Sequence, residues 1–307
     1  MLFLLETVIS GLMAGVMYSL VALGFVLIFK ASGIFNFAQG VFALFAGLAL
    51  YDFIAQDGWF YGVFGFVLPI WLGIIATMGV MIIVAWLVEL LVLRHLVNQE
   101  PIILFMSTIG LAYFMEGLGD MLFGSDVKPL DIGLPSGALD YLLDNYNLYV
   151  EKLEIVAAVV AAALVIVLAI FFQKTRIGRA LRAVADDHQA ALSVGISLRM
   201  IWVIVWSVSG FVALVAGVMW GSKSGIQFSL SLIALKALPV LILGGFTSVP
   251  GAIIGGLIIG VGEKVAEVFG GPYVGGAIEN WFAYVLALGF LLFRPQGLFG
   301  EKIIERV

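Results

Sequence analysis

The segment IVAAVVAAALVIVLAIFF, residues Ile155–Phe172, decides the class of fold because it contains no charged or strongly polar side chain. A helix needs about 20 apolar residues to cross the roughly 30 Å hydrocarbon core of a bilayer. A strand of a membrane barrel would be about 10 residues long and would alternate between apolar and polar side chains, which this segment does not do. The segment therefore predicts a membrane-spanning α-helix.

The rest of the chain has the same character. Of its 307 residues, 63% are hydrophobic and 11% are charged, which is more apolar surface than one soluble core can bury. We therefore expect an all-α polytopic membrane protein, a single membrane domain over residues 1–307, with about nine (eight to ten) transmembrane helices, some of them broken. One apolar run contains Pro69, which predicts a short half-helix followed by a full span. The runs lie at residues 7–29, 33–50, 62–93, 102–123, 153–172, 200–221, 232–245, 251–269 and 281–293.

The distribution of charge predicts which side of the membrane each loop faces. The loop at about 173–199 and the C-terminal tail are rich in Lys and Arg, and short basic loops stay in the cytoplasm. The loop at about 124–152 is acidic and polar, so we expect it outside. Counting about nine crossings back from a cytoplasmic C-terminus places the N-terminus outside. The basic residues are Lys174, Arg176, Arg179, Arg182, Arg199, Arg294, Lys302 and Arg306.

Other classes of function are disfavoured by what the sequence lacks. The chain has no cysteine and only two histidines, so we expect no metal site and no cofactor in this chain. Its net charge of −5 argues against a nucleic-acid partner, which would require clustered basic residues. Neither a G-x-x-x-x-G-K-[ST] phosphate loop nor an H-E-x-x-H motif occurs, so we expect no catalytic residues here. ATP hydrolysis, if it powers this protein, would take place on another chain.

The loop between residues 175 and 196 predicts a short, basic, amphipathic helix. Arg179, Arg182 and Asp186 follow one another at helical spacings of three and four. Small residues at Ala190 and Ala191 would let a partner surface approach closely. The residues alone leave two interpretations open, a docking helix for a partner protein or a membrane-surface helix held by anionic lipid.

This loop resembles the cytoplasmic coupling segment of the permease subunits of ABC importers, in its acidic residue, its Ala-Ala pair and its later Gly-Ile. Further segments resemble the branched-chain amino-acid permeases, specifically the first of the two paired permease subunits. They are GIFNFAQG (33–40) within the stretch 11–47, GGFTSVPGA (244–252) and RPQGLFG (294–300). The resemblance covers nearly the whole chain.

The resemblance implies an importer assembled from several chains in the bacterial inner membrane. The partners would be a second homologous permease subunit, two cytoplasmic ATPase subunits that bind ATP and Mg²⁺, and a periplasmic solute-binding protein. The solute would be a branched-chain or related hydrophobic amino acid, or else urea, a short amide or another small organic molecule. An alternative of another class is a secondary transporter or channel that works alone. The implied ATPase-coupling residues are Arg176, Gly178, Arg179, Arg182, Asp186, Asp187, Ala190, Ala191, Gly195 and Ile196.

Polar residues inside the spans are candidates for the translocation path. Asn36 and Gln39 are three residues apart in one apolar run, so both amides can point toward the bundle interior, where they could contact a passing zwitterion. Glu116 and Lys236 lie within spans, where each charge costs about 2.5–3.5 kcal/mol on insertion scales unless it is paired or hydrated. These candidates are Asn36, Gln39, Glu116 and Lys236. The alternative role is an interhelical hydrogen bond for the two amides, and structural pairing or snorkelling to the membrane surface for the two charged residues. Glu263, Lys264 and Glu267 lie toward an outer end, where we expect a solvated face.

Glycines and one proline predict close helix packing and a turn. The stretch 244–251 is expected to form either a tight turn between half-helices or a plain turn at the cytoplasmic surface. The residues concerned are Gly33, Gly40, Gly244, Gly245, Pro250, Gly251 and Gly255.

Overall fold

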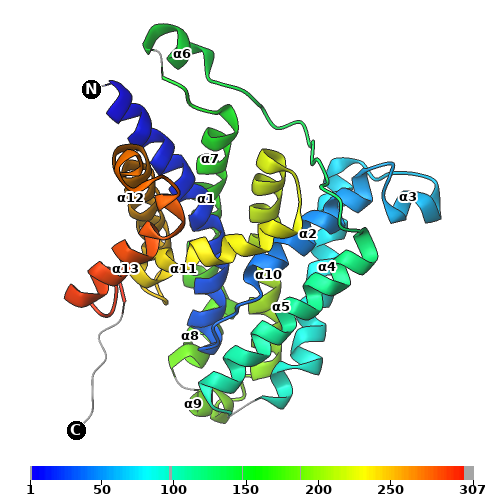
Figure 1. Cartoon of the computed structure of the whole chain (residues 1–307). Helices are drawn as coiled ribbons and strands as arrows, with labels where there is room; N and C mark the ends of the chain where they lie inside the picture. Colours follow the sequence, from blue (N-terminus) through cyan, green and yellow to red (C-terminus); the bar gives the residue numbers. More distant parts are fainter. Residues whose placement is uncertain (1, 97–98, 147, 187, 301–307) are drawn as a thin grey trace. The chain divides into compact units, whose positions relative to one another are not determined.

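The computed structural model of the chain describes residues 2–96, 99–146, 148–186 and 188–300 (Figure 1). Within these ranges the regular secondary structure is helical, apart from two isolated β-bridges. Six helical segments are long and apolar enough to cross a membrane: α1 (Leu2–Ser32), α2 (Gln39–Ile54) continued by α3 (Trp59–Phe64), α4 (Ile70–Leu91) continued to His95, α5 (Pro101–Phe123), α7 (Lys152–Lys174) and α10 (Leu198–Ser224).

A bent pair of helices follows α10. Residues 228–244, which end in α11 (Ile233–Gly244), and α12 (Val249–Val274) meet at an angle of 113°, so the pair is a broken span or a re-entrant loop. The last described helix, α13 (Phe282–Phe293), is short and apolar. Each of the nine apolar runs therefore contains helix, and the all-α polytopic class is confirmed. The shorter elements are α6 (Asp140–Tyr146), α8 (Arg176–Asp186), α9 (His188–Ser193) and the 3₁₀ turns Leu93–His95, Phe228–Leu232 and Ile278–Asn280.

The chain forms two compact units, which are described separately. The first unit comprises Met1–Val26, Leu134–Val165 and Leu235–Val307, and the second comprises Leu27–Gly133 and Ile166–Ala234. The boundaries fall inside α1, α7 and α11, so each of these helices contributes residues to both units.

The centre of the second unit is α2, which packs against α10, α4 and α5. Glycines permit the closest approach: a Cβ on Gly217 of α10 would collide with the carbonyl oxygen of Ala43, and one on Gly40 would collide with that of Ser231. The buried rings of Phe42 and Trp206 then meet edge to face at 5.8 Å. Gly40 therefore lies in close contact with the segment around Ser231.

The two ends of α10 carry loops of opposite charge. The basic helix α8 and the short helix α9 precede its N-terminus, and α8 packs against α10 (Figure 1). Just beyond its C-terminus, Ile226 pairs with Lys128 of the acidic loop, with N–O distances of 2.7 and 2.8 Å. A helix of 27 residues is about 40 Å long, enough to cross a bilayer. The basic loop and the start of the acidic loop therefore lie at opposite ends of one span, as the charge distribution predicted.

The first unit is held together by contact between α1 and α12. A Cβ on Gly256 or Gly260 of α12 would collide with the backbone of Gly15 or Gly11 of α1. The hydroxyl of Ser19 then lies 3.1 Å from the Ala252 carbonyl oxygen of α12. Small residues on both helices allow the dispersion contacts and short hydrogen bonds that hold membrane helices together.

The turn between α11 and α12 joins two of the segments that carry the family resemblance. Gly245 takes a φ of +101°, which favours glycine, and Pro250 lies in the first turn of α12, where a backbone N–H is not needed. The backbone N–H groups of Leu298 and Phe299 donate to the carbonyls of Leu243 and Gly244, at 2.8 and 3.2 Å. This stretch connects α11 to α12, and the choice between a turn joining half-helices and a plain turn at the cytoplasmic surface stays a prediction. Gly244 and Gly251 pack too closely for a Cβ on either.

Candidate translocation and coupling sites

The predicted span 33–50 is interrupted at its start. Residues 33–38 are not helical, because Gly33 takes a φ of +66° directly after α1 and the next helix begins only at Gln39. Asn36 therefore lies in a break between two helices and not on a helix face with Gln39. The expectation of one continuous helix from Gly33 was wrong, and the physical reason is the left-handed backbone that ends α1.

The break places a neutral cluster inside the second unit, made of Asn36, Gln39 and Ser209. All three residues are 0% exposed. The Gln39 side-chain oxygen accepts hydrogen bonds from Asn36 Nδ2 at 3.3 Å and from Ser209 Oγ at 2.8 Å, and Gln39 Nε2 donates to the Ser209 carbonyl at 3.4 Å. Each side chain has a protein partner, so this geometry favours the interhelical hydrogen-bond role that the sequence left open.

Thr108 of α5 extends the hydrogen bonding around this break. Its hydroxyl donates to the Phe35 carbonyl at 3.0 Å and accepts from the Phe37 backbone N–H at 3.1 Å. Thr108 of the neighbouring helix α5 thus provides a hydrogen-bond partner for two backbone groups of the break, the Phe35 carbonyl and the Phe37 N–H. The sequence offered no signal for Thr108 or Ser209, because a single hydroxyl in an apolar helix is common.

A charged cluster lies inside the first unit and consists of Tyr18, Lys236 and Glu263. Lys236 Nζ lies 2.8 Å from Glu263 Oε1, and the Tyr18 hydroxyl donates to the same oxygen at 3.2 Å. The ammonium also lies 5.8 Å from the centroid of the Tyr18 ring. The Glu263 side chain is 1% exposed, whereas that of Lys236 is 29% exposed. Glu263 Oε2 has no hydrogen-bond partner among the described residues.

Glu263 corrects the expectation of a solvated outer face. It points into the unit because Lys236 and Tyr18, both far from it in sequence, supply its partners there. Its neighbours on α12 lie in partly exposed positions: Lys264 pairs with Glu279 at 2.9 Å, and Glu267 accepts from the backbone N–H groups of Ala277 and Glu279. The Lys264 ammonium holds the pKa of the Glu279 carboxyl below its usual value.

Glu116 of α5 is the fourth candidate for the path. It is partly buried, and the Ser231 hydroxyl lies 3.4 Å from its Oε1. Asn36, Gln39 and Glu116 therefore belong to the second unit, and Lys236 belongs to the first. The pathway role of all four remains a prediction.

The corner between α7 and α8 is fixed by hydrogen bonds and by a glycine. The Thr175 hydroxyl accepts from the Gly178 backbone N–H at 2.9 Å, which caps the first turn of α8. A Cβ on Gly178 would collide with the carbonyl oxygens of Phe171 and Phe172. The Arg182 guanidinium donates to the Phe172 carbonyl. Two of the predicted coupling residues, Gly178 and Arg182, thus join α8 to the end of α7.

The exposed face of this region is partly different from the predicted one. Arg176 and Arg179 are exposed, as a docking surface requires. Ala191, which was expected to meet a partner, is only 2% exposed because α9 turns it inward. The apolar side chains that project instead are Leu192, 52% exposed, and Val194, 74% exposed.

The loop after α9 contains Gly195 and Ile196 of the predicted coupling set. Gly195 takes a φ of +83°, and the Ile196 backbone N–H donates to the Ala191 carbonyl at 3.0 Å. This geometry closes the end of α9 before α10 begins. Asp187, Lys302 and Arg306, to which the sequence also assigned roles, lie outside the described residues.

Comparison with known proteins decides the family. The family described as the branched-chain amino acid transport system permease component matches residues 7–294. The chain belongs to this family. The resemblance inferred from the sequence motifs is thereby confirmed, and the chain is a transporter permease component of a membrane complex.

Curated relatives match along almost their whole length. The chain is 27% identical to the high-affinity branched-chain amino acid transport system permease protein LivH of Escherichia coli (strain K12), covering 100% of this chain and 98% of the relative. It is 28% identical to BraD of Pseudomonas aeruginosa, a permease protein of the same description, over 99% of this chain and 98% of the relative. A probable LivH of Methanocaldococcus jannaschii is 26% identical, over 92% and 88% of the two chains.

Proposed function

We propose that this permease takes up branched-chain or related hydrophobic amino acids as one membrane subunit of an ATP-driven importer. The relatives LivH and BraD are permease proteins of branched-chain amino acid transport systems, which supports this class of solute. In the proposed assembly a second homologous permease lies beside this chain, a periplasmic binding protein delivers the solute, and two cytoplasmic ATPases bind ATP and Mg²⁺. The C-terminus and the basic loop face the cytoplasm of the inner membrane.

The exposed apolar tip at Leu192 and Val194 is the observation that carries the coupling part of this proposal. Exposed apolar side chains in a loop that also carries exposed arginines are typical of a protein contact with a charged rim. The helix beside them is bonded to the end of α7 through Gly178 and Arg182, and it packs against α10. A displacement of this tip by an ATPase would therefore move two membrane helices together.

The substitution Val194→Glu tests the docking surface. It places a charge on the exposed tip without touching the corner of α8, so we expect the ATPase subunits to dissociate and ATP-dependent leucine uptake into proteoliposomes to fall at least tenfold. Val127→Glu in the acidic loop is the matched control, since Val127 is 56% exposed. If Val194→Glu still co-purifies with the ATPases and transports like the control, the docking surface is not at this tip.

Two further measurements separate the alternatives for solute and mechanism. Unlabelled valine and isoleucine should compete with labelled leucine in the reconstituted assembly, whereas urea and acetamide should not. Competition by urea or acetamide alone would assign the chain to amide transport. The lone chain in vesicles should accumulate nothing, and concentrative uptake driven by an ion gradient would make it a secondary transporter.

A further inference from the structure

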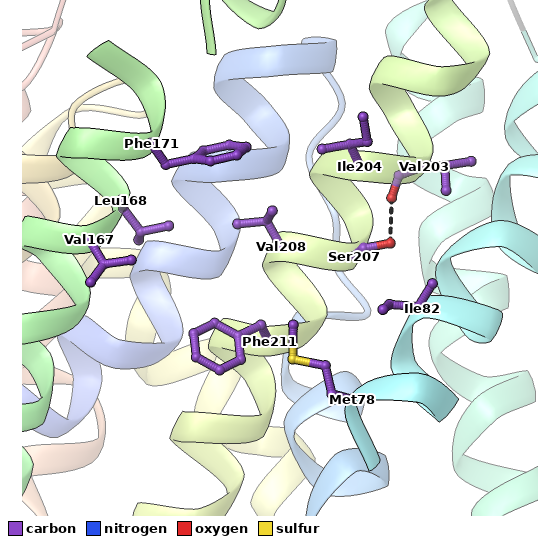
Figure 2. A pocket seen from close by; sticks show the side chains of 10 residues that line it. All are labelled: Met78, Ile82, Val167, Leu168, Phe171, Val203, Ile204, Ser207, Val208 and Phe211. Carbon is purple, nitrogen blue, oxygen red and sulfur yellow. Dashed lines mark hydrogen bonds between the residues drawn. The ribbon is translucent and has the colours of Figure 1, made fainter. Parts of the chain in front are cut away.

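A pocket of about 410 Å³ opens in the second unit between α4, α7 and α10 (Figure 2). Phe171 and Val167 of α7 project into it from one side, Phe211 of α10 lies opposite, and Met78 and Ile82 of α4 complete the wall. Ile82 is 43% exposed and Val167 is 57% exposed, so the pocket is open to the surface that the lipid would cover. Its volume lies within the range of about 300–1,000 Å³ that ligand pockets commonly have.

The lining of this pocket offers nothing for an amino acid to bind. Ser207 supplies its one polar side chain, and that hydroxyl donates to the Val203 carbonyl of its own helix at 2.6 Å (Figure 2). An amino acid would leave its ammonium and carboxylate without partners there, at a high cost in free energy. A hydrocarbon chain has no polar group that would lose a hydrogen-bond partner in this pocket.

One end of the pocket carries positive charge on the same helix faces that line it. Arg199 lies one turn before Val203 on α10, and Lys174 lies one turn after Phe171 on α7. Both residues are exposed. The Phe171 carbonyl accepts the Thr175 hydroxyl at 2.6 Å, so the pocket reaches the corner between α7 and α8.

The third wall of the pocket also ends in residues suited to a membrane interface. Trp86 follows Ile82 by one turn on α4 and is 49% exposed, and tryptophan is enriched at the level of lipid headgroups. The acidic side chain on this helix, Glu89, is buried and paired with Arg94 at 3.3 Å, so its charge is offset. No acidic residue occurs in α10 or in α7 after residue 165.

We propose that this pocket binds an anionic phospholipid, with an acyl chain between α4, α7 and α10 and the headgroup phosphate between Lys174 and Arg199. The apolar lining selects hydrocarbon, and the two cations select a negative headgroup over a zwitterionic one. The lipid would pack against α7 and α10, the two spans that lead into and out of the basic loop.

Lipid retention by the purified full-length chain tests the proposal. Native mass spectrometry would compare dioleoyl-phosphatidylglycerol with dioleoyl-phosphatidylcholine, which share their acyl chains and differ in headgroup charge. We expect preferential retention of phosphatidylglycerol, and a loss of about fivefold in its affinity for each of Lys174→Gln and Arg199→Gln. Ser207→Phe, which fills the pocket, should reduce the binding of both lipids.

The matched control is Lys223→Gln, which removes the same charge at the opposite end of α10 and should leave retention unchanged. The two headgroup variants change exposed side chains, so circular dichroism should show an intact fold. Equal retention of the two lipids would overturn the proposal, as would headgroup variants that behave like the control. If Ser207→Phe leaves phosphatidylglycerol binding intact but separates the chain from a second permease subunit, the pocket is a subunit interface instead.

Discussion

The two polar clusters buried in this protein differ in charge and in how completely their atoms are paired. In the neutral cluster of the second unit, Asn36, Gln39 and Ser209 satisfy one another without exposed surface. In the charged cluster of the first unit, Glu263 is equally buried, but one of its oxygens lacks a hydrogen-bond partner among the described residues and its ion-pair partner Lys236 is 29% exposed.

This difference in charge and pairing indicates which of the two clusters is the better candidate for the solute path. Neutral hydrogen bonds between helices cost little and hold a bundle in register, so the neutral cluster has a sufficient structural explanation. A buried ion pair repays its desolvation only with excellent geometry, and apolar residues of similar volume are often as stable. The charged cluster therefore has the stronger claim to a place on the solute path, because stability alone does not require it.

The largest expected effect comes from breaking the charged cluster. Lys236→Met leaves the Glu263 carboxylate buried without its counter-ion, which should lower the free energy of unfolding by about 3–5 kcal/mol. Thermal unfolding in detergent would measure it. The double variant Lys236→Met/Glu263→Leu should recover most of that stability, yet leucine uptake by the reconstituted assembly should stay low. Normal uptake by the double variant would show that the pair is only structural.

Breaking the neutral cluster should have a smaller effect, confined to stability. Gln39→Leu leaves the Asn36 amide and the Ser209 hydroxyl without a common acceptor, at a cost of about 1–3 kcal/mol. Uptake per folded molecule should not change. Gln173→Leu, at an exposed position near the end of α7, is the control and should alter neither quantity. A tenfold fall in uptake by folded Gln39→Leu would remove the distinction between the two clusters.

The smallest effect is expected at the partly exposed ion pair between Lys264 of α12 and Glu279, which carries charge without deep burial. Lys264→Gln should cost no more than about 1 kcal/mol, because a partly exposed pair is screened by water. The pKa of Glu279 is lowered in the folded chain, so the stabilisation is present above its ordinary value of 4.5 and is lost as the pH falls through the folded value. Melting curves of the two proteins should thus differ at neutral pH and converge in acid. If Lys264→Gln lowered the free energy of unfolding as much as Lys236→Met does, burial of the ion pair would not determine the size of the effect.

Part of the site was predictable because the signals for it are local. The basic amphipathic helix after α7 and the turn that begins at Gly245 each depend on residues a few positions apart. The buried state of Ala191 was not predictable, because it depends on how α9 turns after α8. The role of Thr108 also depends on contact with a segment some 70 residues away in the chain.

The sequence by itself determined that the chain crosses a membrane as helices, which family it belongs to, and which loops carry which charge, since apolar length, motif order and charge are properties of consecutive residues. Only the tertiary structure decided that Glu263 faces Lys236 and Tyr18, and that residues 298–299 hydrogen-bond to the end of α11. These pairings depend on which helix faces meet. Many helix faces in this chain are apolar and of similar hydropathy, so composition alone does not determine which two faces pack together. The small residues and the few polar groups on each face determine that pairing.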